Sequence, residues 1–232
     1  MKLQFLSLHL LLATLLLGCQ ETEDNTTHPV SPPVTDSVPA DPAPPTKTST
    51  GSESEGLLFA DKIKFKNDAG DTLYSLKPKD DGAKLVDADE NELVRFNLDG
   101  KKLKIKDASD NILGWVITTE GKYKIEDAAQ ETELFKLQQQ ADGDWKLEDG
   151  QGQLIYKIKL RDYGFELEDP SETSLYKIKR KDDKTSIRNA ADETVVSTKD
   201  EIVLIAMACL AFDAVDDLNL RAGLATLVLL NE

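Results

Sequence analysis

Histidine and cysteine supply most catalytic nucleophiles, general bases and transition-metal ligands, and both are scarce in this chain. Its two histidines are His9 and His28, and its two cysteines are Cys19 and Cys209. Because no histidine follows residue 28, serine–histidine, cysteine–histidine and histidine-based metal sites are excluded from the rest of the chain. A reactive thiolate needs an accessible, electropositive setting. Cys209 has only Met, Ala and Leu beside it, so we expect it to be a small buried core residue.

Acidic residues are abundant and could form a metal site or a catalytic pair. The run Asp87–Asn91 begins like a calcium-binding EF-hand loop, but Glu92 replaces the required glycine and Leu98 the bidentate glutamate. We therefore expect no metal and interpret the acidic runs as solvated hairpin turns. Paired carboxylates can catalyse hydrolysis when burial separates their pKa values, and this alternative stays open. Our prediction is a protein with no catalytic residue and no cofactor.

Lysines alternate with apolar residues along the predicted strands, as in KIKFK at 62–66. Outward lysines keep sheets soluble, so we interpret these rows as a solvated face. The formal net charge of −15 and a pI of about 4.6 argue against nucleic acid and against general attraction to anionic lipid. The aromatic residues Trp115, Trp145 and Tyr163 could line a pocket, although aromatic residues on strands more often belong to a core.

The first 18 residues have the features of a secretory signal. Lys2 gives a positive start, and Leu6–Leu17 is a leucine-rich hydrophobic region. The sequence Leu16-Leu17-Gly18-Cys19 resembles the bacterial lipobox, which implies cleavage before Cys19 and attachment of diacylglycerol to its sulfur. The alternative is an ordinary signal peptide that contains a cysteine by chance.

A lipid on Cys19 would anchor the chain in the cell envelope, because each buried CH₂ group contributes about 0.8 kcal/mol. In enterobacteria-like systems a residue other than Asp after the cysteine favours the outer membrane, and Gln20 stands there. We therefore expect the outer membrane rather than the inner one. The expected partner is the membrane, through Cys19. A further lipid or envelope-protein partner stays open, and we expect a monomer that binds no nucleic acid.

Residues 19–56 are predicted to be a tether. Seven of the nine prolines lie here among Thr, Ser, Asp and Glu, with almost no large apolar residue. Such a segment cannot bury enough surface to offset its ordering entropy, so we expect it to be disordered and partly extended. At about 3.1 Å per residue it could hold a domain on the order of 100 Å from the bilayer.

From residue 57 onward one pattern returns every 20 residues or so: an alternating strand, an acidic turn and a second alternating strand. Strict alternation indicates half-buried strands. The fold class we predict is mainly β, a closed antiparallel barrel of about 12 strands built from sequential hairpins. A barrel this wide cannot be filled by its own side chains.

A hydrophobic helix near the C-terminus could fill it. Ile202–Phe212 is apolar on every side and must be enclosed, yet it is shorter than the roughly 20 residues that cross a bilayer. We predict a central helix at about 200–216, with Thr198 and Glu201 as a capping box. For 218–232 we expect a second short helix, capped by Asn219 and packed on the barrel mouth, with a final strand as the alternative.

The repeated Leu-Tyr-Lys-Ile-Lys strands, at Leu175–Lys179 and nearly at Ile155–Lys159, followed by the apolar helix, resemble the tubby C-terminal-like superfamily. The nearest branches are the LURP-one-related and phospholipid-scramblase proteins. The resemblance covers residues 57–217 and implies a barrel of about a dozen strands threaded by a hydrophobic helix. It does not extend to the calcium segment of the scramblases. The basic residues of the tubby phosphoinositide site have no position-by-position match here.

Three function classes follow from these observations. The first, which the tether and the missing catalytic groups favour, is a non-catalytic binding or scaffold module displayed from the membrane. The second is a lipid-binding or lipid-handling protein, which only the family resemblance implies. The third is a carboxylate-based hydrolase, whose mark would be converging carboxylates with raised pKa values in one cleft.

Overall fold

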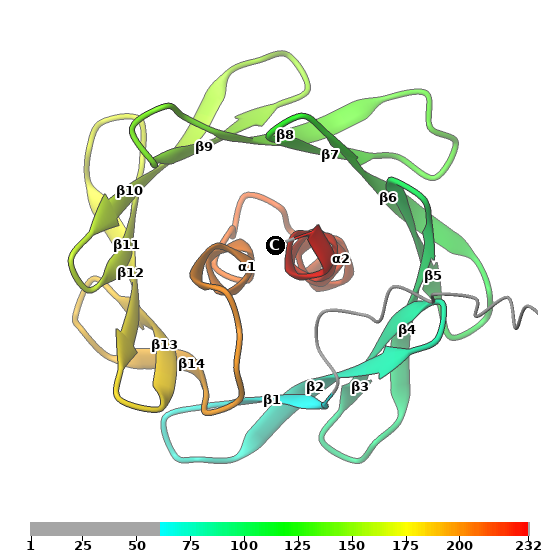
Figure 1. The fold of residues 1–232 in the computed structure, drawn as a ribbon, viewed down its shortest axis with the longest axis horizontal. Coiled ribbons are helices and arrows are strands. Elements are labelled where there is room, and N and C mark those ends of the chain that lie inside the picture. Colours follow the sequence, from blue (N-terminus) through cyan, green and yellow to red (C-terminus); the bar gives the residue numbers. More distant parts are fainter. Residues whose placement is uncertain (1–60, 232) are drawn as a thin grey trace, which may run out of the picture. The chain divides into compact units, whose positions relative to one another are not determined.

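The structure, a computed structural model, describes residues 61–231, so the predictions for the signal peptide, Cys19 and the tether at 19–56 lie outside the described residues. The described part consists of fourteen strands followed by two helices (Figure 1). Their bounds are β1 Ile63–Lys66, β2 Thr72–Lys79, β3 Gly82–Asp87, β4 Glu92–Asp99, β5 Lys102–Asp107, β6 Ile112–Thr119, β7 Lys122–Glu126, β8 Glu133–Gln139, β9 Trp145–Asp149, β10 Leu154–Arg161, β11 Gly164–Glu168, β12 Ser174–Lys181, β13 Lys184–Asn189, β14 Thr194–Thr198, α1 Leu204–Cys209 and α2 Leu218–Asn231.

The strands form one closed antiparallel barrel. Each strand pairs with its neighbours in the sequence, and β1 pairs with β14 to close the ring. The predicted closed barrel of sequential hairpins is therefore confirmed, with fourteen strands in place of about 12. Alternation produces its two faces, as β5 shows: Leu103 and Ile105 are fully buried while Lys102 is exposed.

The seven turns that follow the odd-numbered strands share one design. Each begins with Asp or Asn, whose side-chain oxygen accepts the backbone N–H of the residue four positions later. In the turn after β3, for example, Asp87 accepts the N–H of Asn91 at 2.8 Å, and Glu90 adopts a positive φ of 72°. These turns gather at one end of the barrel, which we call the Asx end. The acidic turns predicted from the sequence are thus confirmed.

Each of the seven hairpins also contains a β-bulge next to its Asx-end turn. In the first hairpin Phe65 pairs with Tyr74 and Lys66 pairs with Thr72, which leaves Leu73 as the extra residue. Bulges bend a strand and increase its twist, which helps a sheet to close. The bulged residue is aliphatic in every hairpin: Leu73, Leu93, Leu113, Leu134, Ile155, Leu175 and Val195.

Both helices lie inside the barrel, α1 beside β11–β13 and α2 beside β4–β7 (Figure 1). The predicted helix at 200–216 is wrong in its bounds, because α1 spans only Leu204–Cys209. The predicted capping box does not form. Thr198 ends β14, and its hydroxyl accepts the N–H of Asp200, while the helix starts after Val203 without a side-chain cap. Thr198 is paired with Thr185 of β13, and this strand pairing prevents it from capping a helix.

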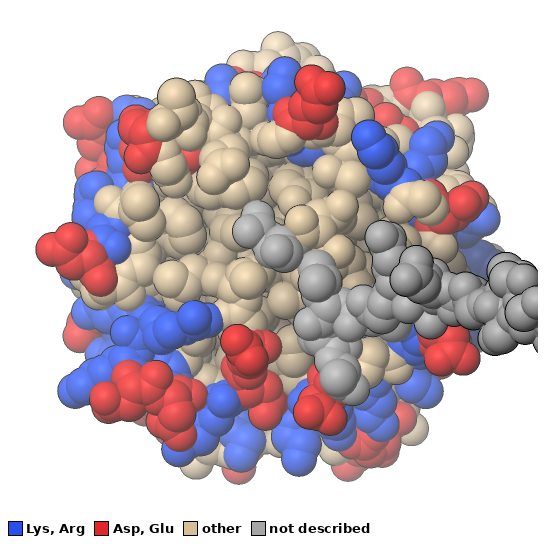
Figure 2. All heavy atoms as spheres, viewed as in Figure 1, with Lys and Arg blue, Asp and Glu red and all other residues tan. Residues whose placement is uncertain are grey.

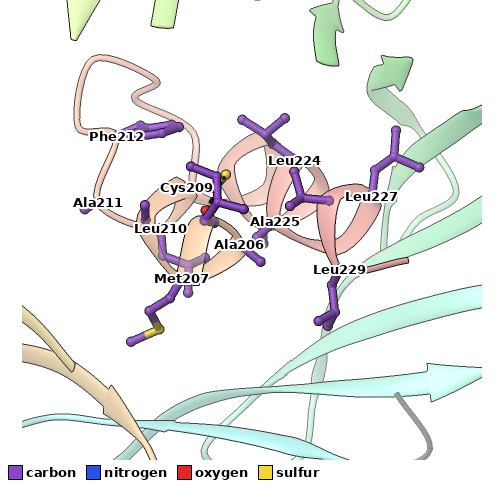
Figure 3. Packing of buried hydrophobic residues seen from close by; sticks show 14 of the residues in the cluster. Ala206, Met207, Cys209, Leu210, Ala211, Phe212, Leu224, Ala225, Leu227 and Leu229 are labelled. Carbon is purple, nitrogen blue, oxygen red and sulfur yellow. Dashed lines mark hydrogen bonds between the residues drawn. The ribbon is translucent and has the colours of Figure 1, made fainter. Parts of the chain in front are cut away.

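The helical prediction for 218–232 is confirmed, but its placement on the barrel mouth is wrong. Residues 222–229 of α2 are all buried, and the helix lies beside α1 within the barrel. Asp217, not Asn219, supplies the carboxylate at its start, accepting the N–H of Asn219 at 2.8 Å. Small residues such as Ala206 of α1 and Ala225 of α2 lie at the contact between the helices (Figure 3). A fourteen-stranded barrel is wide enough to need two helices as filling.

Within residues 61–231, neither helix is long and apolar enough to span a bilayer.

Candidate functional site

Cys209, the one cysteine that the structure describes, is part of the core. Its thiol is fully buried and donates a hydrogen bond to the carbonyl oxygen of Ile205 at 3.2 Å. Burial raises the pKa of the thiol far above its ordinary value, so the reactive thiolate is strongly disfavoured. The interpretation of Cys209 as a buried structural residue is confirmed. Cys19 lies outside the described residues.

The oxygens of the Asp87–Asn91 turn serve the turn itself. Asp87 accepts hydrogen bonds from Asn91 and Asp89, and the Asn91 side chain is the main reason why the pKa of Asp87 is lowered. Glu90 accepts hydrogen bonds from Lys62 and Lys77, which lower its pKa to about 2. Among residues 61–231, no three Asp, Glu, His or Cys residues are grouped so as to hold a metal ion.

Several of the other carboxylates form ion pairs with Lys or Arg. Glu148 lies between Lys136 at 2.8 Å and Lys146 at 2.6 Å, and these two lysines lower its pKa. Every carboxyl group with a shifted pKa in the described region is shifted downward. A catalytic acid needs a raised pKa. These groups therefore suit ion pairing and turn formation rather than general-acid chemistry.

The three aromatic residues singled out in the sequence do not come together. Trp145 is buried inside the barrel beside Tyr123, with ring centroids 6.2 Å apart. Trp115 is half-buried, and the ammonium nitrogen of Lys104 lies 4.7 Å from its ring centroid. Tyr163 has a similar contact with a lysine, at 5.4 Å. The three residues do not form a shared pocket, and Trp145 has the core role that is more common for aromatic residues on strands.

The junction between β1 and β14 is the exception to the continuous pairing of the barrel. The two strands are paired at a single position, Lys66 opposite Ser197. Further along, the backbone N–H of Lys64 donates to the carboxylate of Asp200 at 2.6 Å, so a side chain acts where a strand carbonyl would otherwise lie. An open groove of about 320 Å³ follows this junction. We call it the seam groove, and it is lined by Lys64, Lys66, Asn67, Asp68, Gly70, Lys184, Ser197, Thr198, Lys199 and Asp200.

The hairpin repeat explains why the outer surface is hollow here. The residue two positions after the bulge is long in five hairpins and is serine in the two hairpins that flank the seam. The long residues are Arg95, Trp115, Lys136, Lys157 and Lys177, and the serines are Ser75 and Ser197. Long side chains at this position cover the sheet elsewhere, whereas Ser197 leaves the space beside β1 unfilled.

The groove is locally cationic on an acidic protein. Four lysines and two aspartates line it, a formal excess of two positive charges, although the whole chain carries −15. Within the described part of the chain, Lys64, Lys66 and Lys184 form no salt bridge, whereas Lys199 pairs with Asp183 at 3.1 Å. Figure 2 shows neutral side chains at the centre of the pictured face and charged ones around its rim, with Lys and Arg gathered at the lower left, where Figure 1 places β13 and β14.

A polar cluster at the Asx end, missed by sequence reasoning, holds the connection between the helices. The hydroxyl of Tyr176 donates to Asp213 at 2.5 Å, and that of Tyr156 accepts the backbone N–H of Ala214 at 3.0 Å. Arg221 lies 3.4 Å from Asp213. The hydrogen bond to Asp213 is the main reason why the pKa of Tyr176 is raised to about 12. The signal available in the sequence was Arg221, the single charged residue of an otherwise uncharged helix.

Comparisons with known proteins give a weak structural likeness and no family. No protein-family model matches this chain, and no curated protein matches it significantly. Among solved structures, the X-ray structure of the Arabidopsis thaliana protein AT5G01750 is similar, at 13% sequence identity and a TM-score of 0.36. The match covers 68% of this chain and 93% of the Arabidopsis chain. A likeness at this level says nothing about what either protein binds.

Proposed function

We propose that this chain is a lipid-anchored protein of the bacterial cell envelope that displays a non-catalytic, tubby-like barrel as a binding or scaffold module. The observation that carries the proposal is the filled interior: α1 and α2 occupy the space inside the strands, so recognition falls to the outer surface. The lipobox-like sequence ending at Cys19 and the proline-rich segment after it support a tethered display. Gln20 supports the outer membrane over the inner one.

The same filling argues against carriage of a lipid inside the barrel. An acyl chain there would have to displace side chains such as Phe212 and Leu224, both fully buried. The tubby-like assignment itself rests on the order of the lysine-rich strands and the C-terminal apolar helix. The chain departs from the expected pattern of one threading helix, because a second helix lies beside the first.

The proposed lipid anchor is tested by expressing the full chain in a bacterium fed with radioactive fatty acid. The unchanged chain should be labelled and should partition into the detergent-extracted membrane fraction. Cys19→Ala should lose the label, because the thiol that takes the lipid is gone. Cys209→Ala is the matched control and should stay labelled, since the buried thiol receives no lipid. Equal labelling of the Cys19→Ala and unchanged chains would overturn the proposed anchor.

The non-catalytic part is tested by a broad hydrolase screen on the purified, full-length protein. We expect no turnover. Turnover that disappears when one Asp or Glu is changed would overturn this part of the proposal. Crosslinking in the intact cell envelope then identifies what the barrel holds.

A further inference from the structure

We propose that the seam groove binds a phosphorylated sugar unit. The inference rests on the proposed function of the barrel as a binding module and names its ligand class. Three features carry it: lysines without anionic partners, the size of the groove, and hydrogen-bonding groups that suit sugar hydroxyls.

The lysines of the seam groove differ from those of a second outer-surface hollow on the same barrel. That hollow, of about 450 Å³, lies beside the turn between β8 and β9 and is also lined by lysines. There each lysine has a carboxylate partner: Lys146 with Glu148, Lys157 with Glu172 and Lys159 with Asp144, at 2.6 to 2.8 Å. In the seam groove, three of the four lysines have no such partner among the described residues. The charge of this groove is therefore available to an external anion.

A phosphate monoester matches that charge. It carries about −1.5 to −2 at neutral pH and three strong acceptor oxygens. The excess of two positive charges in the groove balances such a dianion. Lysine binds phosphate as a compact point charge, whereas arginine recognises a planar carboxylate through two parallel hydrogen bonds. A groove lined by several lysines therefore suits a tetrahedral phosphate better than a carboxylate.

The remaining groups and the volume point to a sugar attached to the phosphate. Ser197 contributes a hydroxyl, and Asp68 contributes a carboxylate with no hydrogen bond to another described residue. A carboxylate accepts hydrogen bonds and donates none, so in a groove for anions it suits a ligand that also carries hydroxyl donors. At about 320 Å³ the groove is at the small end of ligand sites, which run from about 300 to 1,000 Å³. A single sugar phosphate is of this scale.

Such a unit could arrive as a soluble sugar phosphate or as part of a phosphate-bearing polysaccharide of the envelope. The test uses the full-length protein in detergent, titrated by isothermal calorimetry at low ionic strength. Glucose 6-phosphate represents the soluble source and a phosphomannan the polymeric source. Glucose and inorganic phosphate are the partial ligands. We expect saturable binding of at least one phosphorylated sugar, weaker binding of inorganic phosphate and none of glucose.

Two pairs of substitutions separate the groove from the general charge. Lys64→Ala with Lys66→Ala removes two cations from the groove and should weaken binding at least about tenfold, since each hydrogen bond to a charged group is worth roughly 1.5–3 kcal/mol. Lys102→Ala with Lys122→Ala removes the same charge from strands outside the groove, where both lysines lack ion pairs within the described region. This control should change the affinity by less than about twofold.

A third substitution distinguishes binding that depends on the shape of the groove from binding that depends on its charge alone. Ser197→Lys places in the last hairpin the residue type that Lys157 and Lys177 supply at the same position, so the fold accommodates it elsewhere. It adds a positive charge but fills the groove. Attraction by charge alone would strengthen binding, whereas a shaped site predicts its loss. Circular dichroism and thermal unfolding check that each variant is folded.

The proposal is overturned if the unchanged protein binds neither phosphorylated sugar up to 10 mM, a concentration on the order of the weakest useful affinities. It is equally overturned if both lysine pairs weaken binding alike, or if Ser197→Lys binds as well as the unchanged protein. Binding of inorganic phosphate as tightly as the sugar phosphates would refute the sugar part. Release of phosphate from glucose 6-phosphate during the titration would refute the non-catalytic function while leaving the groove as its site.

Discussion

Gly223 provides the sharpest test of the position of α2, because the sign of its substitution depends on what the helix touches. A Cβ atom added at Gly223 would lie 2.4 Å from Cδ1 and 3.0 Å from Cγ1 of Ile105, which is fully buried on β5. In a helix free of such contacts, Gly→Ala stabilises by about 1 kcal/mol. Overpacking of a filled core costs about 1–3 kcal/mol. We therefore expect Gly223→Ala to lower the free energy of unfolding by about 1 kcal/mol.

A double-mutant cycle turns this difference into a positional measurement. Ile105→Val removes the Cδ1 atom and should cost about 0.5–1.5 kcal/mol by itself. With Ile105→Val present, the closest clash is gone, so Gly223→Ala should become neutral or stabilising. The expected coupling between the two substitutions is about 1–2 kcal/mol, in the range found for residues in contact. Ile125→Val, on β7, is the matched control and should combine additively with Gly223→Ala.

The assay is urea unfolding of the purified protein, followed by circular dichroism and tryptophan fluorescence, with the slope of the transition compared among variants. Additive effects of Gly223→Ala and Ile105→Val, within about 0.5 kcal/mol, would refute the contact and with it the packing of α2 against β5. A gain in stability from Gly223→Ala alone would refute it as well.

Two further predictions concern the core helix and the Asx-end cluster. Ala206→Asp places a carboxylate where the structure leaves no exposed surface, and an unpaired buried charge should cost several kcal/mol, at least about 3; a thermal midpoint within a few degrees of the unchanged protein would contradict the enclosure of α1. The pKa of Tyr176, raised to about 12, contributes stability that is present below the ordinary tyrosine pKa of about 10 and is lost as the pH rises from about 10 to about 12. In Tyr176→Phe this alkaline loss should be smaller, although not absent, because burial also raises the pKa of Tyr74 to about 12; unchanged pH dependence in urea unfolding would contradict the hydrogen bond to Asp213.

The strands were predictable because their signals are local. Alternation of apolar and polar residues places one face inward whatever the neighbouring strand is, and an Asp or Asn at a turn closes its own backbone without long-range help. The repeat of about 20 residues then implied sequential hairpins, and hairpins of this number imply closure or packing of two sheets. The extent of α1 was not predictable in the same way. Thr198 has the spacing of a helix cap, but β14 holds it in the barrel wall.

The candidate site was less predictable than the fold. In the sequence, Lys64 and Lys66 have the same alternating pattern as the other outward lysine pairs, and nothing local distinguishes Ser197 from other strand residues. Their meaning depends on β14 lying beside β1, about 130 residues earlier in the chain, as in the bond between Lys64 and Asp200 with a separation of 136 residues. Aligning the seven hairpins by their bulges would have revealed the two serines, but not that Ser197 lines a groove beside β1.

The sequence by itself determined the chemistry that the chain lacks, the alternation that makes half-buried strands in sequential hairpins, and two C-terminal segments too apolar to stay exposed. These follow from residue types and short spacings, which fix hydrogen bonding and hydrophobic periodicity locally. Only the tertiary structure decided that both segments enter the barrel and that its first and last strands meet at one paired position. Those outcomes depend on barrel width and on which long and short side chains are brought together when the ring closes. Neither the barrel width nor these side-chain neighbours are set until distant hairpins are in contact.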